Sequence, residues 1–396
     1  MERISTLGID LAKSSFVVCG LDKAGKQVLR REFNRLKFAE FIANTDGCDV
    51  FMEACGSAHF WGRKLRGAGH SVNLIAAQKV VGFRKCNKND RNDAHAIAIA
   101  GKCPGIEFVP VKSVEQQDVQ SLVRIRARLI YRQTALVNEM RGLLAEYGMT
   151  ICEGITPFRS KMSEMANGSI SDFPGITPTI FQCVVSANEE LLDITNRVEK
   201  HEALIHELTK RDDRCRRIQE IPGVGPLSAA TVIASVTNPG AYRNGRQFAA
   251  SIGLTPKHVQ TGGKDSKPVQ LGISKHGDPV LRSMLVQGGM TVAKACKMRM
   301  EKAAKEKSLE KSAENKTSLS SSLGQHPCRE RAKKKAKKKI ITPGREEWMR
   351  RMIAEKGMQK TAVAIANRNA RTILSLLKSG DHYQPLGQQL PLEPVC

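Results

Sequence analysis

The first 75 residues alternate between short apolar runs and short amphipathic stretches. Apolar and β-branched runs at 4–10, 14–20, 27–34, 48–54 and 71–75 predict strands. The glycine-containing turn at 21–25 predicts a hairpin between the second and third of them. Spacing of apolar residues close to 3.6 predicts helices at 36–43 and 58–67. The order β-β-β-α-β-α-β predicts an α/β domain over residues 1–112.

A further helix is predicted to begin at Asp90, where the sequence reads KNDRNDAHAIAIA. Asp90 and Asp93 are three residues apart and therefore share one face of that helix. Two carboxylates so placed repel each other unless a cation lies between them, and Mg²⁺ or Mn²⁺ prefers carboxylate oxygens. The alternative is a solvated helix start, where aspartate is favoured by the helix dipole.

Two more acids stand at the ends of predicted strands. Asp10 closes the first strand, and Glu53 lies near the end of the strand at 48–54. Open α/β sheets place their sites at strand ends. Asp10, Glu53, Asp90 and Asp93 together form a four-acid set able to hold two metal ions, which could stabilise the attacking and leaving oxygens of a phosphoryl transfer.

The middle of the chain, residues 113–214, is predicted to be helical. Leucines recur every seven residues at Leu122, Leu129, Leu136 and Leu143, and a second helix at 189–210 places apolar residues near a/d positions. The Pro-, Gly- and Ser-rich stretch 155–178 is interpreted as the link between the two helices. This pattern predicts an antiparallel coiled coil, and the periodicity alone fits a subunit interface and a plain helical core equally well. The exposed face is predicted to be solvated or to meet phosphates, and its arginines are Arg124, Arg126, Arg128 and Arg132.

The stretch IPGVGPLSAATVIA at 221–234 has the pattern of a helix-hairpin-helix element. Its turn carries Gly223 and Gly225 and opens a helix whose N-terminal amides can accept a phosphate. Such elements hold the nucleic-acid backbone without reading bases. The alternative is a simple tight turn between two helices.

Charge and cysteine usage narrow the class of protein. The chain has 396 residues and a net charge of +24, which favours a polyanionic partner such as nucleic acid. The eleven cysteines are odd in number and form no CxxC pair, so reduced thiols in a cytoplasmic, nucleoid-associated protein are expected. Neither a signal peptide nor a membrane span is expected.

The C-terminal third changes character twice. Residues 301–342 are rich in lysine, and their core, 302–339, is predicted to be disordered or a loosely helical arm. Residues 343–380 return to an amphipathic helical pattern. The proline-rich tail, 381–396, is expected to be disordered.

Three of these stretches resemble one known family. LGIDLAKSSFVV, FMEACGS and KNDRNDAHAIA resemble the RuvC-like DEDD domain of bacterial insertion-sequence transposases, of the "one-ten" family and its "eleven-eleven" subgroup. The block beginning RQFAASIGLTPKHVQTGG, within residues 215–300, resembles the transposase domain typical of that family. The resemblance implies an RNase H-like (RuvC-like) fold for the first domain and a mainly α C-terminal domain. It also implies dependence on Mg²⁺ or Mn²⁺, held by the four acids.

The resemblance further implies a second catalytic centre, in which a serine of a Gly-rich loop attacks the phosphate. At that place this sequence has Thr261, followed by Gly262, Gly263 and Lys264. Thr261 is our candidate nucleophile, with Ser266 as the nearest substitute. The loop glycines, Lys264, Lys275 and Arg282 are candidates for phosphate contact, the alternative being an ordinary polar surface loop.

The partners implied by the resemblance are the DNA of the element ends and target, and a structured non-coding guide RNA. A homo-oligomer, dimer or tetramer, is implied as well. Two other functions stay open from the residues themselves. One is a RuvC-type structure-selective endonuclease that uses water as its nucleophile, and the other is a non-catalytic nucleic-acid-binding protein on a nuclease-like fold.

Overall fold

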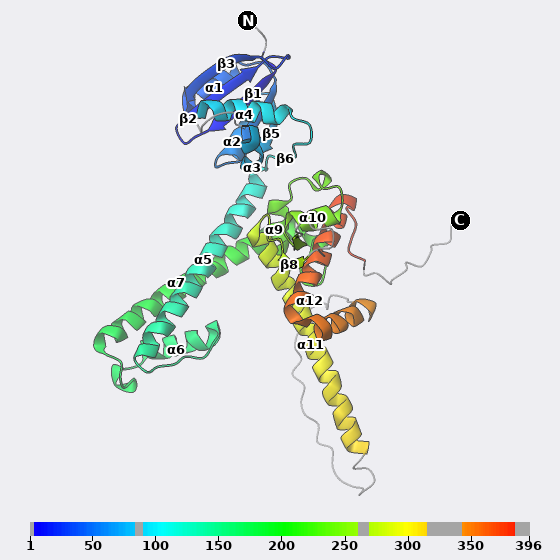
Figure 1. The fold of residues 1–396 in the computed structure, drawn as a ribbon. Coiled ribbons are helices and arrows are strands. Elements are labelled where there is room, and N and C mark those ends of the chain that lie inside the picture. The colour runs from blue at the N-terminus through cyan, green and yellow to red at the C-terminus, as the bar shows by residue number, and fades with distance from the viewer. Residues whose placement is uncertain (1–3, 84–89, 260–268, 315–342, 385–396) are drawn as a thin grey trace. The chain divides into compact units, whose positions relative to one another are not determined.

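The computed structural model describes residues 4–83, 90–259, 269–314 and 343–384 (Figure 1). The chain divides into two compact units, Met1–Gln117 and Asp118–Cys396. The first is a mixed α/β unit and the second is mainly helical. Within the described ranges, no helix is both long and apolar enough to cross a bilayer.

A six-stranded sheet organises the first unit. Its strands are β1 (Thr6–Leu11), β2 (Ser15–Leu21), β3 (Gln27–Asn34), β4 (Asp49–Glu53), β5 (Ser71–Ile75) and β6 (Phe108–Val109). Their order across the sheet is β3-β2-β1-β4-β5-β6. β1 and β2, β2 and β3, and β5 and β6 are antiparallel, whereas β4 runs parallel to both β1 and β5. The five predicted strands are confirmed to within two residues at each end.

Helices cover both faces of this sheet. α1 (Arg35–Ala43) and α2 (Ala58–Gly67) share a core with Leu7 and Ile9, and the rings of Phe16 and Phe38 stack there with centroids 4.7 Å apart. α4 (Asp90–Lys102) packs against the alternate residues of the strands on the other face. The short helices α3 (Ala77–Val80) and η1 (Val81–Phe83) follow β5. Side chains alternate between the two faces of a strand, so each face is an independent set of residues.

The second unit begins with two long antiparallel helices, α5 (Val114–Glu146) and α7 (Pro178–Arg211). Ion pairs Arg126–Glu202 and Arg132–Glu190 show that the two helices are antiparallel, because residue numbers rise along α5 while those of the partners on α7 fall. The predicted coiled-coil pairing is therefore present. The stretch 155–178 links the two helices as predicted, and it also contains α6 (Ile155–Asn167) and η2 (Ile170–Asp172), which sequence analysis did not predict.

The remainder of the second unit is built around two more long helices. α11 (Pro279–Glu314) and α12 (Pro343–Ser379) pack together, and a Cβ at Gly289 would lie 2.3 Å from the carbonyl oxygen of Ala362. The shorter elements are α8 (Asp213–Ile218), α9 (Pro226–Ser235), η3 (Pro239–Ala241), α10 (Gly245–Ser251), β7 (Pro256–Val259) and β8 (Val269–Ile273).

The first part of the Lys-rich region agrees with the helical alternative. α11 continues to Glu314, so the first part of 302–339 is helix. The rest of that region lies outside the described residues, as does the tail from residue 385 onward.

Candidate functional site

Asp10 and Glu53 lie at the carboxyl ends of two neighbouring parallel strands. Ile9 of β1 is paired with Met52 of β4, and Asp10 and Glu53 are the next residues on their strands. Both carboxylates are half-buried. The parallel register thus brings two acids that are 43 positions apart in the sequence (53 − 10) next to each other at one edge.

Both acids lie on the face of the sheet that α4 covers. Leu7 and Ile9 belong to the core on the opposite face, so Asp10 lies on the α4 side. Phe51 packs against Ile97 of α4, and Glu53, two residues on, shares that side. The alternation of each strand therefore aims the two carboxylates into the layer between sheet and helix.

The N-terminal half of α4 lies directly over β1. A Cβ at Gly8 would lie 2.3 Å from the carbonyl oxygen of Ala94 and 2.6 Å from the Cβ of Ala98. Asp93, next to Ala94, is only 5% exposed. Asp90 is the first residue of α4, and its side chain lies outside the described part of the chain. Glycine at position 8 is what permits the helix carrying two of the acids to approach the strand carrying a third.

Cys55 lies two residues after Glu53, and its thiol is 3.9 Å from the carbonyl oxygen of Leu11, the residue that follows Asp10. Burial, and then the charges of Glu53 and Asp10, raise the pKa of this thiol. Sequence analysis did not single out Cys55, and only its position two residues after Glu53 could have indicated it.

The donor set suits a hard divalent cation by its chemistry, since it consists of carboxylates alone. Within the described residues, no three His, Cys, Asp or Glu side chains are gathered closely enough to hold an ion. The register and the α4 contact place Asp10, Glu53 and Asp93 in one layer. The fourth acid, Asp90, is on the first turn of the same helix.

The predicted helix-hairpin-helix stretch, 221–234, comprises the turn between α8 and α9 and most of α9. Gly223 has a φ of +89°, and a Cβ there would lie 2.6 Å from the carbonyl oxygen of Gly288 in α11. Close packing against α11 therefore requires glycine at position 223. Gly225 precedes α9, and a Cβ there would meet nothing within 4 Å. Of the two glycines, Gly225 is the one with open space around it.

The C-terminal segment is hydrogen-bonded to the turn between α8 and α9. The backbone amide of Tyr383 donates to Glu220 (2.8 Å), and Nδ1 of His382 lies 2.8 Å from the same carboxylate. The buried Arg345 donates to the Tyr383 hydroxyl at 2.9 Å. These contacts attach the last described residues of the chain to the turn that precedes α9.

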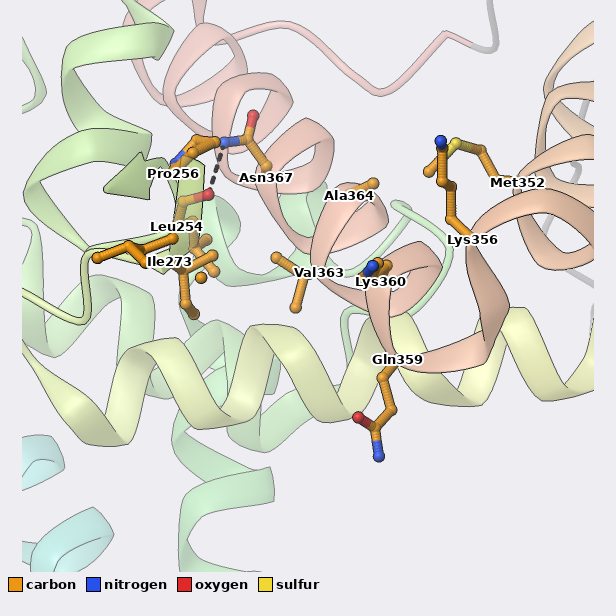
Figure 2. Close-up of a pocket in the computed structure, with 12 residues that line it drawn as sticks. Leu254, Pro256, Ile273, Met352, Lys356, Gln359, Lys360, Val363, Ala364 and Asn367 are labelled. Carbon is orange, nitrogen blue, oxygen red and sulfur yellow. Dashed lines mark hydrogen bonds between the residues drawn. The ribbon is translucent and has the colours of Figure 1, made fainter. Parts of the chain in front are cut away.

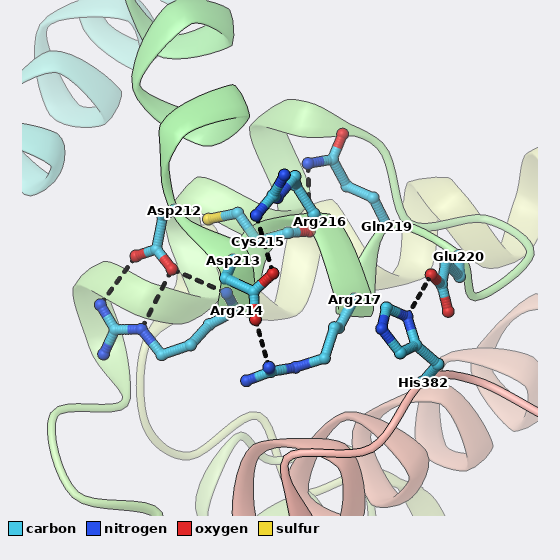
Figure 3. Close-up of polar contacts among 9 residues, drawn as sticks. All are labelled: Asp212, Asp213, Arg214, Cys215, Arg216, Arg217, Gln219, Glu220 and His382. Carbon is cyan, nitrogen blue, oxygen red and sulfur yellow. Dashed lines mark hydrogen bonds and ion pairs between the residues drawn. The ribbon is translucent and has the colours of Figure 1, made fainter.

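Arginines of α8 lie beside the same hairpin and are engaged with acids (Figure 3). Arg214 pairs with Asp212 at 2.7 Å, while Arg216 (2.9 Å) and Arg217 share Asp213. Burial alone would raise the pKa of Asp212, but the hydrogen bonds and charge of Arg214 outweigh it and lower that pKa. Sequence analysis missed this group, although the run RDDRCRR contains four arginines and only two acids.

The second predicted centre is only partly described. Thr261, Gly262, Gly263 and Lys264 lie outside the described residues, between β7 and β8, and Ser266 does too. β7 and β8 are antiparallel partners and so form a hairpin that this loop connects. The sequence was interpreted there as a flexible loop alone, so the strands themselves were missed.

Two cations predicted to contact phosphates have different surroundings. Arg282 donates to the carbonyl oxygens of Ile252 (3.0 Å) and His276 (2.7 Å), which gives it a structural role. Lys275 is exposed and has a positive φ of 58°. Lys275 is therefore the freer of the two to meet a phosphate.

Comparison with known proteins identifies the family. The model of the DEDD transposase domain of IS110 matches residues 7–149, and that of the "Transposase IS116/IS110/IS902 family" matches residues 215–305. The chain is 36% identical over 385 residues to the "Transposase for insertion sequence element IS1111A" of Coxiella burnetii, covering 97% of this chain and 92% of the relative.

Two further relatives agree with this. A "Probable family 20 transposase" of Pseudomonas aeruginosa is 36% identical over 386 residues, covering 96% of this chain and 99% of the relative. The "Transposase for insertion sequence element IS1328" of Yersinia enterocolitica is 32% identical and covers 72% of this chain and 83% of the relative. The chain belongs to the IS116/IS110/IS902 family of transposases.

Proposed function

We propose that this transposase breaks and rejoins DNA strands at a cation-dependent centre formed by Asp10, Glu53, Asp90 and Asp93. The observation that carries the proposal is the parallel register of β1 and β4, which sets Asp10 and Glu53 side by side beneath α4. The carboxylates of Asp10, Glu53 and Asp93 lie in one layer and repel each other, and bound Mg²⁺ or Mn²⁺ would remove that repulsion.

The topology of the sheet supports the finer assignment of an RNase H-like domain. Three antiparallel strands, β3-β2-β1, are followed across the sheet by β4 and β5, which run parallel to β1. This is the order and direction that such a fold requires. It places the ends of β1 and β4 at the centre of the sheet, where the rigid backbone holds their acids in position.

Each acid has a role that follows from its element. Asp10 and Glu53 are fixed by central strands, while Asp90 and Asp93 lie on the first turn of α4. The ions held there would stabilise the negative charge that develops on the attacking and leaving oxygens of a phosphoryl transfer. The protein's own contribution is to hold the four carboxylates on one side of the scissile phosphate.

The nucleophile we propose is the hydroxyl of Thr261, in the loop that joins β7 to β8. Its oxygen would form a bond to phosphorus while the bond from phosphorus to one ester oxygen of the DNA breaks. The threonine proton would pass to water, and the leaving oxygen would take up a proton to become a free hydroxyl. The extra methyl group of threonine restricts χ1, so the reaction would be slower than with serine.

The partners we propose are DNA, a structured guide RNA and further copies of the chain. The net charge of +24 suits two polyanions at once. Gly225 and Lys275 are the described groups among our candidates best placed to meet phosphates without reading bases. Sequence choice would then be delegated to base pairing with the RNA, as in other RNA-guided systems.

The test is to trap the reaction on DNA taken from the flanks of the element, in Mg²⁺, with a denaturant. The proposal predicts a covalent protein–DNA adduct that Thr261→Ala abolishes and Thr261→Ser retains or increases. Ser266→Ala is the matched control and should leave the adduct unchanged. An adduct that survives Thr261→Ala contradicts the assignment. Cut DNA with no adduct from the unaltered protein would instead favour the water-using endonuclease.

A further inference from the structure

A groove of about 850 Å³ lies between the β7–β8 hairpin and α12 (Figure 2). Its volume falls within the ~300–1,000 Å³ typical of ligand pockets. The floor is apolar and includes Leu254, Ile273 and Val363. Lys356 and Lys360 stand at its margin, and both are exposed. Nothing described above uses this groove.

The shape of the groove depends on a break in α12. Gly357 has φ 79° and ψ 170°, a conformation essentially restricted to glycine. The break turns the helix, so that Met352 and Lys356 before it lie across from Leu254 and Ile273 (Figure 2). Glycine adopts this conformation without steric cost, whereas any other residue there would be strained.

The charge of the groove selects its occupant. Among the described residues that line it, none is acidic. Neither Lys356 nor Lys360 takes part in an ion pair with another described residue. A ligand with a flat apolar part and a negative charge would match both the apolar floor and the two lysines at the margin.

The position of the groove further narrows the choice of ligand. Two walls come from β7 and β8, whose connecting loop carries Thr261. Val269 and Leu271 on β8 are 60% and 46% exposed, so the apolar surface continues along the hairpin toward that loop. Base faces are available to such a surface only where the strand is unpaired, because a duplex presents its phosphates and sugars outward.

We infer that this groove binds an unpaired stretch of the DNA strand beside the scissile phosphate, with bases on the apolar floor and phosphates at Lys356 and Lys360. The inference rests on the proposed function, since it takes DNA cleavage at the β7–β8 loop as given. It adds a substrate site on α12 that reads no particular base, because every base has an apolar face.

The test is equilibrium binding of the full chain to a gapped duplex and to the same duplex without the gap. Val363→Trp fills the floor and should weaken binding to the gapped DNA at least tenfold, with less than a twofold effect on the intact duplex. Ser375→Trp, on an exposed position of α12 outside the groove, is the matched control and should change neither.

A second variant changes only the two exposed lysines and leaves the apolar floor of the groove intact. Lys356→Gln combined with Lys360→Gln should flatten the slope of log affinity against log salt by about 1.4 for single-stranded DNA, at about 0.7 per phosphate contact. Lys200→Gln, an exposed α7 position outside the groove and outside the Lys-rich region, should leave that slope unchanged.

Two results would overturn the inference. One is equal affinity of Val363→Trp and the unaltered protein for gapped DNA. The other is a changed oligomeric state with unchanged DNA binding, which would assign the groove to a second copy of the chain. Both readouts are independent of cleavage, so loss of the covalent adduct alone would affect the proposed function and not this site.

Discussion

At the scale of single residues, the candidate centre depends on glycine as much as on acids. Gly8 lies between two core residues of β1, where the side chain of any other residue would meet the backbone of α4. Gly101 has the same role at the other end of that helix, since a Cβ there would lie 2.1 Å from the ring of Phe51. The carboxylates are conspicuous in the sequence, whereas the glycines that bring them together are not.

We predict that Gly8→Ala destabilises the first unit by about 1–3 kcal/mol, because the added methyl group must displace a backbone carbonyl. It should also lower strand cleavage, since α4 carries Asp90 and Asp93. Chemical denaturation and a cleavage assay measure the two effects. Gly67→Ala is the control, with open space around its Cβ, and should change the free energy of unfolding by less than about 0.5 kcal/mol. Equal stabilities of the two variants would contradict the packing argument.

At the scale of elements, the seven-residue spacing predicted most of the buried stripe on α5. Leu129 is 2% exposed and packs with Ile194 and Val198, and Leu122 and Leu136 are partly buried within the same helical pair. Leu143 differs, because it is 43% exposed and its neighbour Leu144 is buried instead. A repeat of leucine fixes the spacing of a stripe but does not say which of two adjacent leucines is buried. On α7 the predicted positions Leu191, Ile194, Val198 and Ile205 are buried.

A polar layer that the sequence did not indicate crosses this helical pair. Thr195 of α7 accepts hydrogen bonds from Gln133 of α5 (3.0 Å) and Arg159 of α6 (2.7 Å). Its own hydroxyl donates to the carbonyl of Leu191 (2.7 Å). Gln133 is 7% exposed, so its amide depends on this acceptor. One hydroxyl thus connects three helices.

We predict that Thr195→Val lowers the free energy of unfolding of the second unit by about 1–3 kcal/mol, because it leaves buried donors without an acceptor. Thr195→Ser keeps the hydroxyl and should cost less than about 1 kcal/mol. Urea denaturation of the full chain compares the two. If valine were tolerated as well as serine, the hydroxyl would have no structural importance at this position.

At the scale of the whole molecule, the pattern of apolar residues predicted the first unit well and parts of the second unit poorly. The order of strands and helices in the first unit followed from apolar spacing, because each run lies between clear turn residues. The β7–β8 hairpin escaped notice because its strands are only four and five residues long and contain Lys257, His258 and Gly272. The groove on α12 could not be predicted either, since it requires a helix break at Gly357 and contacts between residues about 100 positions apart.

The excess positive charge supports a prediction about the Lys-rich region. α11 is regular to Glu314, so a deletion is best placed at 315–339, replaced by a Gly/Ser linker of equal length. We expect weaker, sequence-independent nucleic-acid binding and a flatter dependence of log affinity on log salt, because fewer counterions are released. Fluorescence anisotropy over a salt series measures both. An unchanged slope would show that this region makes no phosphate contacts.

The central claim, that four acids form one cation-dependent centre, can be tested without knowing the DNA sequence. Calorimetric titration with Mn²⁺ should detect binding to the unaltered protein, and Asp10→Asn, Glu53→Gln, Asp90→Asn and Asp93→Asn should each abolish or strongly weaken it. Asp22→Asn, in the exposed turn between β2 and β3, is the control and should bind Mn²⁺ normally. Unchanged Mn²⁺ binding in all four variants would contradict the account.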